Sequence, residues 1–96
     1  MASTATTTTT TVNDTATIVA RGSRQIDVSV SGLVVGDVVQ AQRSPDGGTT
    51  WYEVETYTAD DERVLQSASI KDHRLQYTDD TGGGTIVMTM RAGNAY

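Results

Sequence analysis

The chain turns at residues 44–51, which read SPDGGTTW, and this stretch decides the fold class. The runs on either side, residues 38–43 and 51–58, alternate in the two-residue period of β-strands. Asp46 can accept hydrogen bonds from backbone N–H groups further along the turn, and the glycines that follow it allow positive φ angles. Trp51 can lie over the turn as a lid. The stretch therefore predicts a β-hairpin.

Similar alternating segments, separated by turn-forming residues, extend outward from this hairpin along most of the chain. Their spacing of about 8–12 residues is typical of an all-β sandwich. With 96 residues, the chain is long enough for one domain only. We therefore expect a single immunoglobulin-like β-sandwich of about seven short antiparallel strands. The expected strands are residues 15–20, 25–31, 38–43, 51–58, 63–66, 73–78 and 85–91.

The alternation also predicts which side chains form the core. Residues 32–37 are expected to be a loop whose apolar side chains, Leu33, Val34 and Val35, plug one end of the sandwich. Trp51 is expected on the strand face opposite to its neighbour in the core. The predicted core consists of Ile18, Ile26, Val28, Val30, Val39, Ala41, Tyr52, Val54, Leu75, Tyr77, Ile86, Met88 and Met90.

The N-terminal residues are of low complexity and include an unbroken run of threonines at residues 6–11. Threonine favours extended backbone, but this run has little to bury and is expected to be disordered alone. The expected organisation is an extended arm at 1–13, a sandwich at 14–92 and a tail at 93–96. The arm is either an ordered tail without a functional partner or a strand added to a neighbouring subunit's sheet edge. The predicted partner-binding residues are Thr6, Thr7, Thr8, Thr9, Thr10, Thr11, Val12 and Tyr96.

Composition disfavours several classes of function. The net charge is −5, and the seven basic residues are scattered singly, so phosphate contacts with nucleic acid are not expected. No apolar run approaches the ~20 residues that span a bilayer, and no signal-peptide layout is present. The absence of cysteine excludes disulfides and thiolate metal sites.

No catalytic, cofactor or metal site is predicted. The single histidine, His73, is interpreted as a surface residue at the start of a strand. The acidic clusters, residues 60–62 and 79–80 with Asp72, lack the spacing of a calcium-binding loop and are interpreted as solvated turns. We therefore expect a protein that is not an enzyme.

The turn itself resembles the Asp-box, a hairpin motif found repeatedly in sialidases and related β-propellers. The matching residues are Ser44, Asp46, Gly48, Thr50 and Trp51. In that family the motif is usually a folding element remote from the catalytic site, and it recurs once per blade. Here it occurs once. The resemblance therefore implies a structural hairpin, with glycan contact and catalysis as the alternative interpretations.

A wider segment, residues 36–54, is similar to segments of small β-sandwich proteins in tailed-phage virions. As in those proteins, an acidic turn follows, then a strand like residues 73–77, a glycine-rich loop and a closing strand TIVMTM. The similarity extends over most of residues 24–91. It implies a structural role in a virion, as head decoration or cement protein, head–tail connector component or tail protein. It transfers no catalytic residues.

The expected function is therefore a head decoration protein, carried in the virion after assembly in the host cytoplasm. Its expected partner is the major capsid protein or another virion protein, with the chain as a homo-oligomer or bound to a lattice. A connector or tail component of the same virion is one alternative. A carbohydrate-binding module is another, with Trp51 and Tyr57 on one strand face about 20 Å apart as a platform for an extended glycan.

Overall fold

A computed structural model describes residues 3–20, 24–67 and 71–92, and these residues form eight β-strands. The first strand, formed by part of the threonine-rich segment, is not among the strands expected from the sequence. The strands are β1 Ser3–Thr9, β2 Thr15–Ala20, β3 Arg24–Ser31, β4 Asp37–Ser44, β5 Tyr52–Tyr57, β6 Asp61–Ser67, β7 Lys71–Asp80 and β8 Ile86–Ala92.

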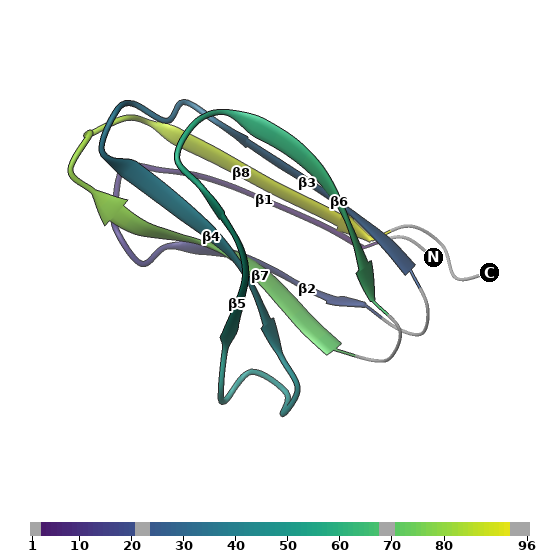
Figure 1. Cartoon of the computed structure of the whole chain (residues 1–96). Coiled ribbons are helices and arrows are strands. Elements are labelled where there is room, and N and C mark those ends of the chain that lie inside the picture. The colour runs from purple at the N-terminus through teal and green to yellow at the C-terminus, as the bar shows by residue number, and fades with distance from the viewer. Residues whose placement is uncertain (1–2, 21–23, 68–70, 93–96) are drawn as a thin grey trace.

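Each strand of the first half of the chain pairs with its counterpart in the second half. β1 pairs with β8, β2 with β7, β3 with β6 and β4 with β5, and every pair is antiparallel. The chain is thus one long hairpin rolled into two layers, the sheets β1-β8-β3-β6 and β2-β7-β4-β5 (Figure 1). This nested order is that of a jelly roll, the eight-stranded architecture made of two sheets.

The prediction of an all-β sandwich is confirmed, but its immunoglobulin-like detail needs correction. An immunoglobulin domain keeps its first two strands, A and B, side by side in one sheet. Here β1 and β2 lie in different sheets, and β1 lies beside the last strand, β8. The difference also involves the later strands, because β3 lies between β8 and β6, and β2 lies beside β7.

The core lies between the two sheets and consists of the inward side chains of both. On β8, for example, the alternation places Ile86, Met88 and Met90 inward with no exposed surface, as predicted. Eleven of the thirteen predicted core residues are buried, and Tyr52 and Val54 are exposed instead. The buried apolar residues are Ala16, Ile18, Ile26, Val28, Val30, Val39, Ala41, Tyr57, Leu65, Leu75, Tyr77, Ile86, Met88, Met90 and Ala92.

A β-bulge on β5 explains why the prediction is wrong for Val54, whereas Tyr52 is exposed because it lies opposite the exposed Arg43 at the hairpin end of the strand. Ala41 lies opposite Glu55, but the next residue of β4 lies opposite Glu53, so Val54 has no partner. An extra residue of this kind reverses the alternation beyond it. Tyr57 therefore points into the core, 4% exposed, whereas Trp51 lies on the outer face of the sheet.

The predicted free arm, residues 1–13, is also corrected by the fold. Residues 3–9 pair with β8 of the same chain over seven consecutive positions, from Ser3 opposite Ala92 to Thr9 opposite Ile86. Threonine can occupy such a strand because its β-branched side chain favours extended backbone and its methyl group tolerates burial. The segment is therefore part of the domain, and the boundary placed at residue 14 is wrong.

A buried carboxylate, Asp37, fixes the loops at one end of the sandwich. It accepts hydrogen bonds from the Tyr77 hydroxyl at 2.6 Å and from the N–H groups of Val34, Gly83 and Gly84 at 3.0 Å each. The Tyr77 hydrogen bond is the main cause of the lowered pKa of Asp37, and it opposes the effect of burial. Asp37 therefore joins two loops that are far apart in the sequence.

The loop held by Asp37 only partly closes the sandwich. Leu33 packs against the core, as predicted for the whole apolar loop. Val34 is 50% exposed and Val35 is 94% exposed, so these two side chains do not plug the end. The reason is geometric: the hydrogen bond from Asp37 N–H to the Val34 carbonyl, 2.9 Å, makes a tight turn that points outward.

Candidate partner-binding surface

The first candidate surface is the edge strand β1, which holds four of the predicted partner-binding residues. In the described part of the chain, no strand pairs with its outer edge. Its side chains alternate: Thr7 and Thr9 point inward, whereas Thr6 and Thr8 are exposed on the outer face. The hydroxyl groups of Thr6 and Thr89 on β8 are hydrogen-bonded at 3.3 Å. β1 thus offers an uncharged row of backbone groups for pairing.

Residues 10–14 connect β1 to β2 across one side of the sandwich. The buried Thr9 hydroxyl donates to the Asp14 carboxylate at 2.6 Å and accepts from the Thr11 N–H at 2.8 Å. On the strands themselves, the Thr7 hydroxyl donates to the Thr15 carbonyl at 2.8 Å. Hydroxyl groups, rather than ion pairs, therefore hold β1 against β2.

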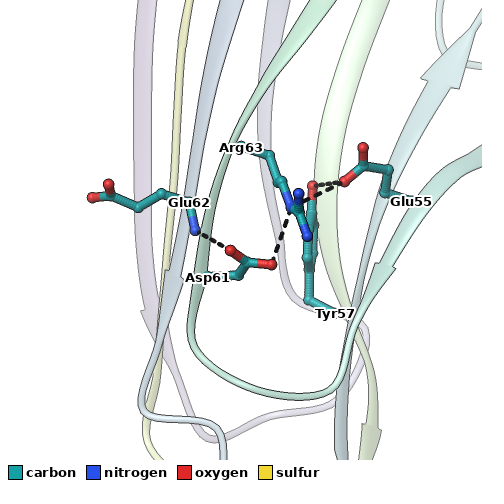
Figure 2. A network of polar contacts seen from close by, with 5 residues as sticks. All are labelled: Glu55, Tyr57, Asp61, Glu62 and Arg63. Atoms are coloured by element: carbon teal, nitrogen blue, oxygen red, sulfur yellow. Dashed lines mark hydrogen bonds and ion pairs between the residues drawn. The ribbon is translucent and has the colours of Figure 1, made fainter.

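The opposite side of the sandwich, where β5 and β6 form the sheet edges, is closed by charged side chains. Figure 2 shows Arg63 between Asp61 and Glu55, at 3.1 and 4.0 Å from their carboxylate oxygens. The Tyr57 hydroxyl donates to Glu55 at 3.0 Å, and burial is the main cause of its raised pKa. The Glu62 N–H donates to the Asp61 carboxylate. These charges and the β5 bulge are features that protect a sheet edge from further pairing.

The hairpin predicted from residues 44–51 has the hydrogen bonds expected of it. One oxygen of Asp46 accepts from the Ser44 hydroxyl at 2.7 Å and from the Thr50 N–H at 2.8 Å. These bonds, led by the one from Thr50, lower the pKa of Asp46 to about 2. The Trp51 indole N–H donates to the Gly48 carbonyl at 3.1 Å and ties the ring to the turn. The motif is thus stabilised by its own residues.

The outer face next to this hairpin carries a polar cluster that is not among the sites expected from the sequence. The Gln42 amide donates to Gln40 and Gln76 at 3.0 and 3.1 Å, and Arg74 Nε donates to the Gln42 oxygen at 2.6 Å. The Arg74 guanidinium also lies 4.2 Å from the centre of the Trp51 ring. The residues come from β4, β7 and the turn before β5, and strand pairing, which local patterns do not reveal, brings them together.

The same geometry rules out the predicted glycan platform of Trp51 and Tyr57. Six positions on an uninterrupted strand would place both rings on one face, but the unpaired Val54 puts them on opposite faces. Tyr57 is buried in the core, and one face of the Trp51 ring is covered by Arg74. These two rings cannot stack on one sugar chain.

The fold does not gather all the predicted site residues at one place. Thr6–Thr9 lie on β1, and Thr10, Thr11 and Val12 follow in the turn to β2. The hairpin residues lie towards the opposite edge of the second sheet from β2, because β7 and β4 separate β2 from β5. Tyr96 lies outside the described residues. The predicted surfaces, edge strand and hairpin, are therefore separate.

A shallow depression of about 620 Å³ lies on the outer face of the first sheet. Its lining includes Asp27 and Glu62 as well as Arg63 and Arg91, around the exposed Val64. Because both signs of charge line it, the depression has no evident preference for an anion or a cation.

Residues 3–20, 24–67 and 71–92 contain no group of three or more histidine and acidic side chains placed to hold a metal ion. This same part of the chain has no helix that is long and apolar enough to span a membrane. His73, expected at the surface, is buried.

Comparison with known proteins gave no match: neither a family model nor a curated protein is significantly similar to the chain.

Proposed function

We propose that the chain is a structural protein of a virion, of the head decoration or cement type, without enzymatic activity. It would join its neighbours by strand pairing along the outer edge of β1. The major capsid protein or another virion protein is the proposed lattice to which it binds. A connector or tail component of the same virion is the alternative location.

The observation that carries this proposal is the contrast between the sheet edges. β1 has neither charge nor bulge nor proline, whereas β5 carries Glu53, Glu55 and a bulge, and β6 begins with Asp61, Glu62 and Arg63. Edge strands left without such protection are templates for another strand. Strand addition supplies affinity through backbone hydrogen bonds.

Two further points support a virion as the setting. The jelly-roll architecture recurs in viral capsid domains, although lectins and cupins also use it, so the fold alone does not select among them. The similarity of residues 36–54 to tailed-phage virion proteins favours the first of these classes.

The test is to look for the protein in purified virions of the phage that encodes it. We expect quantitative mass spectrometry to find it in stoichiometric amounts and immunogold labelling to place it on the head. Labelling at the neck or tail would favour the alternative location. Its absence from purified virions would overturn the proposal.

A further inference from the structure

We propose that the strand that pairs with β1 is β1 of a second copy, arranged antiparallel about a two-fold axis. The sheet β1-β8-β3-β6 of one copy and the same sheet of the second copy would then form one continuous sheet of eight strands. This inference rests on the proposed assembly function and names the partner at that edge.

The alternation of β1 and the length of the strand together determine the register of such a pair. Inward residues must lie opposite inward residues, or one strand would turn its outer face to the core. Centring the axis on Thr6 meets this condition: Thr6 lies opposite Thr6, Ala5 opposite Thr7 and Thr4 opposite Thr8. It also uses the whole strand, because Ser3 then lies opposite Thr9.

The absence of charge on β1 allows a second copy to pair with it. In a two-fold interface each surface meets itself, so like charges on it oppose one another. The chain has a net charge of −5, but no residue from Ser3 to Asn13 is charged. Self-pairing of β1 therefore opposes no like charges, whereas β5 or β6 would bring several glutamates or aspartates close to their own copies.

The side chains of β1 are suited to this contact. Thr6 already forms a cross-strand hydroxyl pair with Thr89 on its inner neighbour, and the two-fold axis would place a second Thr6 on its other side. The inward pair, Ala5 and Thr7, is small and half-buried, so the two cores could meet without a clash. β2 is also uncharged, but its Thr15 carbonyl already accepts the Thr7 hydroxyl.

Sedimentation velocity of the purified full chain tests the association. We expect a dimer that dissociates on dilution, and an affinity on the order of 100-fold weaker in the double variant Thr6→Lys, Thr8→Lys, because two lysines would oppose one another at the axis. The matched control is Val64→Lys, Gln66→Lys on the outer face of β6, which should dimerise like the wild type. Near-ultraviolet circular dichroism checks that each variant is folded.

A cysteine variant tests the register without adding charge. The chain contains no cysteine, so Thr6→Cys introduces one thiol. Directly opposed residues of antiparallel strands have Cα atoms about 4.5–5.5 Å apart, within the range of a disulfide. On mild oxidation, Thr6→Cys should form a covalent dimer far faster than Gln66→Cys.

A wild-type chain that stays monomeric at every concentration would overturn self-pairing, as would equal cross-linking of the two cysteine variants. Undiminished association of the β1 lysine variant would have the same meaning. None of these results bears on the presence of the protein in virions, so the function proposed above could still stand. Conversely, a dimer that is absent from virions would overturn that function alone.

Discussion

The two sides of the sandwich differ in how their sheet edges meet solvent. On the β5–β6 side, Arg63 bridges two carboxylates and a bulge interrupts the β5 ladder. On the β1–β2 side, the ladder of β1 runs without interruption for seven positions, and threonine hydroxyls provide the polar contacts. The difference indicates that one side is built against strand addition and that the other has no such barrier.

Among the changes that test this difference between the two sides, removing β1 should have the largest effect on stability. We expect deletion of residues 1–9 to lower the free energy of unfolding by about 3 kcal/mol or more, at ~0.5–1.5 kcal/mol for each lost backbone hydrogen bond. The deletion would also expose the edge of β8, where Met88 and Met90 are fully buried. Urea unfolding followed by the fluorescence of Trp51, the only tryptophan, measures the change.

The lysine variant of β1 is the reference for this experiment, because it keeps the strand while blocking its edge. If the deletion and the reference unfold at the same urea concentration, β1 is an appended arm after all. That result would restore the domain boundary that the sequence predicts.

Replacing the buried hydroxyl on the β1–β2 side should cost less. Thr9→Val keeps the volume but leaves the Thr11 N–H and the Asp14 carboxylate without their partner. We expect a loss of about 1–2 kcal/mol in the free energy of unfolding. Thr8→Val, at the adjacent exposed position of the same strand, is the control and should be nearly neutral.

Acid should affect the hairpin next to β5. The pKa of Asp46 in the folded protein is about 2, below the ordinary value. Its stabilising contribution is therefore complete above about pH 4, the unfolded pKa, and is lost as the pH falls through about 2. The amide proton shift of Thr50 should follow this titration, and Asp46→Asn should abolish it. A midpoint near pH 4 would contradict the hydrogen-bonded geometry.

The smallest effect is expected for the ion pairs of the β5–β6 side. Arg63 is 56% exposed, so its interactions with Asp61 and Glu55 are screened by solvent. Arg63→Ala should change the free energy of unfolding by about 0.5 kcal/mol or less. A loss as large as that of Thr9→Val would mean that the charged network stabilises the fold, and does not serve only to protect the sheet edge from pairing.

Local patterns were sufficient to predict most strands and the hairpin. Ile86, Met88 and Met90 alternate with more polar residues, and the expected hydrogen bonds of Asp46 involve residues within four positions. Such features depend on residues that are close together in the sequence, so the local pattern is enough to predict them.

Three features depend on distant residues and could not be predicted in this way. A threonine run has no apolar–polar alternation, so nothing in residues 3–9 indicates a partner as remote as β8. The bulge at Val54 leaves no mark on the pattern of β5, although it decides where Tyr57 points. Likewise, the contact of Asp37 with Tyr77 joins strands that are forty residues apart.

The nested strand pairing described above also implies an order of folding. Arg43 and Tyr52 close the innermost pair across a short turn, whereas Thr9 and Ile86 close the outermost pair around nearly the whole chain. Closing a loop costs more entropy as the loop lengthens, and inner pairs shorten the loops of outer ones. Folding that starts at the Asp46 hairpin and proceeds outward therefore docks β1 last. Until β1 docks, both β1 and the edge of β8 are unpaired in a newly synthesised chain. Two chains that meet at this stage can therefore exchange their first strands.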